Sequence, residues 1–271
     1  MRIPVTWLYV PGDRPERFAK AADSGADVVI IDLEDAVAPA RKDEARANAV
    51  SYLRSRPPGG PPVHVRVNDL TTQRGLDDLD ELGRSADAVR LPKVESATAL
   101  DLVERLGVRA YALLESAAGI LEARAVAAHP CVDGIALGEQ DLAAELAITG
   151  GLALDHLRLR AVLAAAAAGL PPVPMAVYPD VRDEAGLAAS CAEGRALGMF
   201  GRTAIHPRQI PVIRAAFRPT PEETARAAEI VQAADAAGAG AFALPDGRFV
   251  DAPIVARARR TLVLSTQLAD S

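Results

Sequence analysis

The feature that most constrains the fold of this chain is a repeated alternation of short apolar runs and amphipathic segments. Eight runs rich in Val, Ile and Leu recur, and each is followed by a stretch with helical periodicity. They are Thr6–Val10, Val28–Leu33, Val63–Val67, Ala88–Pro92, Ala110–Glu115, Gly134–Leu137, Met175–Tyr178 and Phe200–Ile205. Their ends are about 20 to 40 residues apart, the length of one strand and a returning helix. Eight such units predict an α/β fold, a closed (β/α)8 TIM barrel.

A doubly wound open sheet is the alternative fold, because the same alternation builds it and periodicity does not show whether a sheet closes. The length of 271 residues suits a single barrel. We assign the barrel to residues 1–218. Residues 219–271 exceed what a barrel needs and are expected to form a C-terminal helical extension.

Composition narrows the class of partner and the compartment. The net charge is −6, and no basic stripe is interleaved with aromatic residues. A nucleic acid is therefore not expected as the binding partner, whereas a small molecule is. No apolar run approaches the roughly 20 residues of a membrane span. The apolar start ends at Pro11, which is too early for a signal peptide, so a cytoplasmic protein is expected.

Charged residues follow the ends of several predicted strands. Barrel enzymes build their active sites where the strands end, so these positions are informative. The residues are Asp32, Glu34, Asp35, Arg66, Lys93, Glu115, Glu139 and Asp141. Carboxylates dominate this predicted rim.

Glu115 and Asp141 follow the fifth and sixth runs, which are neighbours in a barrel. Their carboxylates could converge on one hard cation, and oxygen ligands favour Mg²⁺ or Mn²⁺ over zinc. Alternatively, Asp141 caps the helix that begins at Leu142, and Glu115 pairs with an arginine of the rim. The residues alone leave both interpretations open.

Asp32 and Glu34 alternate along the second run, so their side chains are expected on one side of the strand. Arg66 on the adjacent third run is a partner for them. A guanidinium held by carboxylates would be preorganised to stabilise an oxyanion, or the three side chains form a structural ion pair.

Taken together, several motifs resemble one known family. They are Pro11-Gly-Asp-Arg-Pro15, Asp32-Leu-Glu-Asp-Ala-Val37, Arg66-Val-Asn68, Leu91-Pro-Lys93, Glu115-Ser-Ala-Ala-Gly119, Gly138-Glu-Gln-Asp-Leu142 and Ala204-Ile-His-Pro207. In this order they resemble the citrate lyase β-subunit-like family, which is grouped with malyl-CoA and citramalyl-CoA lyases and the HpcH/HpaI aldolases. The match runs over essentially the whole chain.

The resemblance implies Mg²⁺ held by Glu115 and Asp141, a substrate-binding Arg66, and coenzyme A thioesters as ligands. It also implies a homotrimer in which a C-terminal aspartate reaches a neighbouring subunit's site. The matching residue here is Asp251, the best candidate for proton transfer. Relatives often carry Thr-Ala-Arg after the glutamate, where this chain has Ser-Ala-Ala, so one basic contact is expected to be missing.

On this basis the chain is expected to cleave or form a β-hydroxyacyl thioester such as citryl-, malyl- or citramalyl-CoA, giving an acyl-CoA and a 2-keto acid. Arg66 and Asp251 are assigned to catalysis, with Asp32 and Glu34 as orienting residues. Substrate and coenzyme A contacts are assigned to Arg14, Lys20, Arg66, Lys93, Gly138 and Glu139.

Three alternative functions stay open from the sequence. One is a citrate lyase complex subunit that acts on citryl groups of an acyl carrier protein. The second is a pyruvate-type aldolase for free hydroxy-keto acids. The third is a metal-free barrel that binds ligands without turnover.

Overall fold

The computed structural model describes residues 3–238 and 240–269. By their internal contacts they form two compact units, one spanning Ile3–Ala216 and one that begins at Phe217. The boundary expected from the sequence, after residue 218, lies close to this division.

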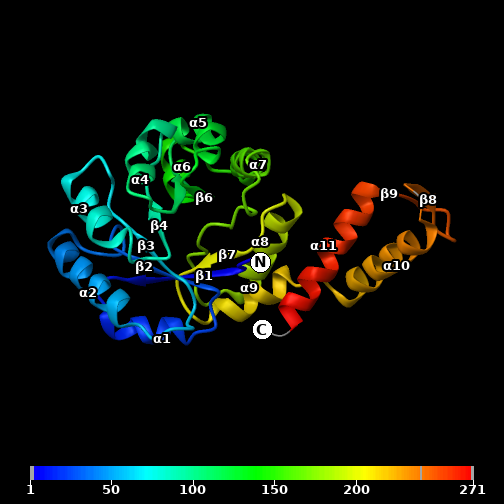
Figure 1. Cartoon of the computed structure of the whole chain (residues 1–271), viewed down its shortest axis with the longest axis horizontal. Coiled ribbons are helices and arrows are strands. Elements are labelled where there is room, and N and C mark those ends of the chain that lie inside the picture. Colours follow the sequence, from blue (N-terminus) through cyan, green and yellow to red (C-terminus); the bar gives the residue numbers. More distant parts are fainter. Residues whose placement is uncertain (1–2, 239, 270–271) are drawn as a thin grey trace. The chain divides into compact units, whose positions relative to one another are not determined.

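The first unit is built on one parallel sheet of seven strands. They are β1 (Thr6–Pro11), β2 (Val28–Asp32), β3 (Val63–Arg66), β4 (Ala88–Leu91), β5 (Ala110–Leu114), β6 (Val132–Leu137) and β7 (Arg202–Ala204). Their order in the sheet is β6-β5-β4-β3-β2-β1-β7. Successive strands from β1 to β6 are neighbours, and right-handed crossovers that all advance in one direction place every connecting helix on the same face. This order excludes the doubly wound sheet, and Figure 1 shows the sheet curling with helices outside it.

The connections of this unit are helical. The α-helices are α1 (Phe18–Ala22), α2 (Lys42–Ser55), α3 (Gln73–Leu82), α4 (Asp101–Arg105), α5 (Ala117–Ala127), α6 (Glu139–Glu145), α7 (Gly151–Ala167), α8 (Glu184–Ala196) and α9 (Gln209–Phe217). Short 3-10 helices cover Pro15–Arg17, Pro39–Arg41 and Ala97–Leu100. Strand β2 is buried at every residue, since helices cover one face and the curl encloses the other.

The predicted closed barrel of eight strands is not what the described residues show. The run Met175–Tyr178 forms no strand, and Met175 makes only one parallel bridge, to Arg202 of β7. Strand β6 is therefore an edge of the sheet. Pro171, Pro172 and Pro174 precede the bridge, and proline has no N–H to donate to a ladder. The result is a curled half-barrel of seven strands.

The second unit consists of two helices and a hairpin. Helix α10 (Pro221–Ala237) begins with a capping box between Thr220 and Glu223. The antiparallel strands β8 (Ala241–Ala243) and β9 (Phe249–Asp251) follow, and then α11 (Ala252–Ala269), which packs against α10. The hairpin was not predicted. In the described part of the chain, every helix is too short or too polar to cross a membrane.

Candidate active site

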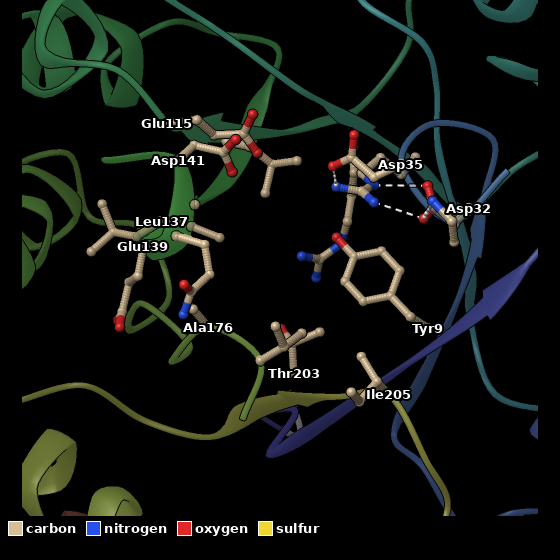
Figure 2. Close-up of a pocket in the computed structure, with 18 of the residues that line it drawn as sticks. Tyr9, Asp32, Asp35, Glu115, Leu137, Glu139, Asp141, Ala176, Thr203 and Ile205 are labelled. Atoms are coloured by element: carbon tan, nitrogen blue, oxygen red, sulfur yellow. Dashed lines mark hydrogen bonds and ion pairs between the residues drawn. The ribbon is translucent and has the colours of Figure 1, made fainter. Parts of the chain in front are cut away.

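The main pocket of the first unit lies where the strands end and has a volume of about 390 Å³. Its lining includes residues from all seven strands of the sheet and from the segments that follow β5 and β6, and Figure 2 shows many of their side chains. The polar lining residues are Tyr9, Asp32, Asp35, Arg66, Arg90, Glu115, Glu139, Gln140, Asp141 and Thr203. Most of the charged residues expected at the rim from the sequence therefore meet at one cavity.

Arg66, the last residue of β3, is held by carboxylates of β2 and the loop after it. Its Nε and Nη2 donate to the two oxygens of Asp32 at 2.8 and 2.6 Å, a bidentate pair. Nη1 lies 3.0 Å from Glu34 Oε2 and 3.2 Å from Asp35 Oδ2. The Tyr9 ring packs beneath the guanidinium, 4.9 Å from Cζ to the ring centroid. These contacts leave the guanidinium little freedom to move.

Asp32 is itself fixed by the backbone. Its Oδ1 accepts the N–H of Glu34 at 2.9 Å and its Oδ2 that of Ala36 at 3.1 Å. Burial alone would lower the pKa of Arg66, but the hydrogen bonds to Asp32 and the nearby negative charges outweigh burial and raise it. Arg66 therefore carries a permanent positive charge in a fixed position.

Glu34 is buried, and the negative charge of its carboxylate is only partly balanced by neighbouring groups. Neither of its carboxylate oxygens has a hydrogen-bond partner among the described residues, although Arg66 and Lys93 lie within ion-pair distance. Burial, above all, raises the pKa of Glu34, and Asp35 and Asp32 add to the effect. The carboxylate lies close enough to Glu115 to raise the pKa of that residue as well.

Glu115 and Asp141 lie side by side at the pocket, with their carboxylates next to each other in Figure 2. Glu115 is 8 % exposed and accepts one N–H, from Lys93, at 3.3 Å. Burial, followed by repulsion from Glu34 and Asp141, raises the pKa of Glu115 to about 8. Gly138 allows this packing, because a Cβ there would lie 2.5 Å from Glu115 Cγ.

These two acids fit a hard divalent cation. Both supply oxygen ligands, which Mg²⁺ and Mn²⁺ prefer, and Glu115 is buried with insufficient positive charge nearby to hold its pKa at an ordinary value. A bound cation would remove that repulsion. The alternative in which Glu115 pairs with a rim arginine does not hold here, since Arg66 is engaged by Asp32, Glu34 and Asp35.

The pKa of Glu115 predicts how metal affinity depends on pH. Near neutral pH the ligand-free carboxyl group is mostly protonated, and a cation must displace that proton. Apparent Mg²⁺ affinity should therefore fall by about tenfold for each pH unit below about 8, and binding near pH 7 should release about one proton per ion. Calorimetry in buffers of different ionisation enthalpy measures both quantities. An affinity that stays constant between about pH 6 and 8 would contradict this expectation.

Among the residues assigned to the substrate, Glu139 is already occupied. Arg158 of α7 donates to both of its oxygens at 2.9 and 2.5 Å, and the carboxylate points away from the pocket in Figure 2. Only the remainder of Glu139 lines the cavity, so its carboxylate is not free for a ligand. Lys93 is half exposed, and its Nζ lies 3.6 Å from Glu34 Oε1.

The remaining assigned residues, Arg14, Lys20 and Asp251, are not among the residues that line the main pocket. Arg14 is exposed beside Asp13, with 3.9 Å between the charged atoms. Lys20 of α1 lines a second cavity of about 400 Å³, which shares Tyr9 and Ile205 with the main pocket. Asp251 belongs to the second unit, where its Oδ1 accepts the N–H of Ile254 at 3.3 Å.

Four polar pocket residues were not predicted from the sequence: Tyr9 of β1, Arg90 of β4, Gln140 and Thr203. Arg90 is the one charged residue within the run Ala88–Pro92. Its isolation in an otherwise apolar strand was the signal available, since burial of an arginine requires a specific reason.

The sequence of the chain is similar to those of proteins of known family. The model of the HpcH/HpaI aldolase/citrate lyase family matches residues 6–207. The chain belongs to this family. It is 38 % identical over 273 residues to the (3S)-malyl-CoA thioesterase of Cereibacter sphaeroides, covering 97 % of this chain and 94 % of the relative. It is also 30 % identical over 293 residues to the human mitochondrial citramalyl-CoA lyase, covering 97 % and 86 %.

The chain is also similar in three-dimensional structure to a solved protein. Protein CitE from Mycobacterium tuberculosis, in complex with magnesium, acetoacetate and coenzyme A, superposes with a TM-score of 0.85 at 36 % identity. The alignment covers 97 % of this chain and 98 % of that one. Family membership over nearly the full length makes the present chain a lyase.

Proposed function

We propose that the protein is a Mg²⁺-dependent carbon–carbon lyase that cleaves or forms a β-hydroxyacyl-CoA, giving an acyl-CoA and a 2-keto acid. The observation that carries the proposal is the buried Glu115, repelled by the neighbouring carboxylate of the exposed Asp141, beside a guanidinium fixed by carboxylates. The relatives support it, since CitE was solved with magnesium and coenzyme A and the human relative is a citramalyl-CoA lyase.

In this proposal Glu115 and Asp141 would hold the ion. When bound, the ion would supply Lewis-acid polarisation of the keto-acid carbonyl. Arg66 donates its remaining N–H to the thioester oxygen, where negative charge develops as the carbon–carbon bond breaks. Asp32 and Glu34 act through Arg66, because they set the position of its guanidinium before the substrate arrives.

We further propose that coenzyme A lies near Lys20 and Arg14, and that Asp251 of a neighbouring subunit in a cytoplasmic homotrimer exchanges the proton at the α-carbon of the thioester. Arg17 and Lys20 line the second cavity, and two cations there suit the phosphates of a coenzyme A arm. That cavity shares Tyr9 and Ile205 with the main pocket, so a ligand could extend from one into the other.

Arg66→Lys is expected to lower kcat at least about tenfold, equivalent to roughly 1.4 kcal/mol. A lysine ammonium cannot reproduce the bidentate pair with Asp32 and also contact the substrate, since it is a single point of charge. Steady-state kinetics with a cleaved thioester measure the loss. The matched control is Arg109→Lys, which alters an exposed pair with Asp133 at the opposite ends of the strands. Equal kcat in Arg66→Lys and wild type would assign Arg66 to structure.

The experiment that tests the function is a panel of β-hydroxyacyl-CoAs incubated with the protein and Mg²⁺, with detection of free 2-keto acid. Release from one or more CoA esters, abolished by a chelator, is the expected result. Release from free hydroxy-keto acids alone would make the protein a pyruvate-type aldolase. Release only from a citryl group on an acyl carrier protein would make it a subunit of a citrate lyase complex.

A further inference from the structure

Arg90 of β4 is a buried arginine that has no acidic partner among residues 3–238 and 240–269. The residue is 1 % exposed, and its Nε and Nη2 have no hydrogen-bond partner among the described residues. In the sheet it pairs with Arg66 of β3 and Tyr111 of β5, so all three side chains project from the same face. That face lines the main pocket, where both Arg66 and Arg90 are found.

The groups around Arg90 are aromatic or positively charged. Its Cζ lies 5.2 Å from the centroid of the Tyr111 ring, and its guanidinium donates a hydrogen bond to the Tyr9 hydroxyl. Burial, above all, lowers the pKa of Arg90, Tyr9 and Tyr111 counteract this, and Arg66 lowers it further. His64, 5.0 Å from the Tyr111 ring, has a pKa lowered to about 3 by burial and then by Arg90, so it is neutral.

Other buried arginines of this unit are fully engaged, which makes Arg90 unusual. Arg158 pairs with Glu139 and Asp155. Arg202 donates to Ala176 O, Cys191 Sγ and Ser190 Oγ. Burying donor nitrogens without acceptors is costly, so a guanidinium at a pocket wall with two unpartnered nitrogens suits an anion that arrives with the ligand.

The metal acids do not supply that anion. In Figure 2 Glu115 and Asp141 lie on a different side of the cavity from Tyr9, the residue that contacts Arg90. A keto acid that chelates an ion at Glu115 and Asp141 uses its own carboxylate and carbonyl there. Arg66 has its charge balanced by Asp32, Glu34 and Asp35. The unmatched positive charge of the pocket is that of Arg90.

We propose that Arg90 binds a second carboxylate of the substrate, one that the metal does not hold, and so selects dicarboxylic over monocarboxylic keto acids. The inference rests on the function proposed above and narrows its substrate class. The two unpartnered nitrogens, Nε and Nη2, lie on the same edge of the planar guanidinium, and a carboxylate can accept from such a pair with both oxygens.

The test compares Mg²⁺-dependent binding of oxaloacetate and 2-oxobutanoate by calorimetry with freshly dissolved ligands. The two keto acids have the same chain length, and a methyl group replaces the second carboxylate in 2-oxobutanoate. Wild type should bind oxaloacetate at least about tenfold more tightly, and Arg90→Met should lose that preference while it still binds 2-oxobutanoate. Retained 2-oxobutanoate binding shows that the fold and the metal site of the variant are intact.

Two further variants separate anion binding from a structural role. Arg90→Lys keeps the charge without the fork and should retain part of the preference. Arg202→Met removes a partnered buried arginine and should lower Tm without changing the preference, whereas ligand-free Arg90→Met should melt no lower than wild type. If Arg90→Met does not fold, the inference is tested with Arg90→Lys. An unchanged preference of this variant for oxaloacetate over 2-oxobutanoate would overturn the proposed two-nitrogen contact with the carboxylate.

Equal binding of the two keto acids by wild type, or an undiminished preference in Arg90→Met, would overturn the inference and leave the proposed function standing. If Arg90→Met bound both keto acids more weakly and to the same degree, the inference would also be overturned, because Arg90 would then act on the 2-keto acid group that the two ligands share. Failure of wild type to bind either keto acid with Mg²⁺ would overturn the proposed function, and this inference with it.

Discussion

Glu115→Gln and Asp141→Asn are each expected to weaken Mg²⁺ binding at least about 100-fold, or about 2.7 kcal/mol, and to abolish metal-dependent turnover. Each change removes one negative charge and one anionic oxygen from a site that the chain builds from two acids. Amide oxygens are weaker ligands for a hard cation than carboxylates. Calorimetric titration with Mg²⁺ and steady-state assays at saturating metal measure the two losses.

The thermal stability of the Glu115→Gln variant tests independently whether the pKa of Glu115 is raised. Because the pKa of Glu115 is raised to about 8, the folded protein holds this proton more tightly than the unfolded chain does. The stability of ligand-free wild type therefore decreases as pH rises from about 4.5 to 8, a loss that a glutamine avoids. Above about pH 8 the variant should have a higher Tm than wild type.

A matched control for the metal-site variants is Glu122→Gln, an exposed acid on α5. It should leave Mg²⁺ affinity and turnover unchanged. Metal dependence that persists in both Glu115→Gln and Asp141→Asn would place the ion elsewhere and contradict the proposed site.

Asp251→Ala is expected to bind Mg²⁺ and keto acid as wild type does, yet to turn over about 10² to 10⁴ times more slowly. Asp251 ends β9 in the second unit, whereas every proposed metal and arginine contact belongs to residues of the first. A proton-transfer group supplied by another subunit would leave each metal site intact and remove only the chemical step. Calorimetry and single-turnover kinetics separate binding from chemistry.

The decisive experiment for Asp251 mixes two inactive variants, Asp251→Ala and Glu115→Gln, under conditions that let subunits exchange. Some mixed interfaces would then combine an intact metal site with an intact Asp251. Partial recovery of activity supports a shared site. No recovery, with exchange demonstrated by labelled subunits, would place Asp251 in its own subunit's site or outside catalysis.

The order of elements follows from local patterns in the sequence. Seven of the eight apolar runs form strands, since a short buried run between helical segments has few other ways to bury its side chains. The run Met175–Tyr178 satisfies the same pattern, but the prolines before it remove ladder donors and leave a single bridge. The hairpin β8–β9 was missed because its strands are three residues long, too short for a strand pattern to stand out, and are mostly exposed or half-buried.

The acids at the pocket were also accessible from sequence. Parallel strands place their carboxyl ends at one edge, so residues after consecutive runs meet there however far apart they are in the chain. Asp32 and Arg66 pair for this reason, because their strands are adjacent and in register. Position at a strand end was therefore enough to find Glu115 and Asp141.

What the tertiary structure alone decided is how each charge is compensated. Glu139 follows strand β6 and Arg90 lies within β4, and the neighbouring sequence does not show which of these charges finds a partner of opposite sign. The fold brings Arg158 to Glu139 and neutralises it, whereas the described groups that act on Arg90 are Tyr9, Tyr111 and Arg66, none of them an acid. Charge compensation depends on partners from distant segments and on burial, and both are set only when the elements pack, so a local pattern cannot contain them.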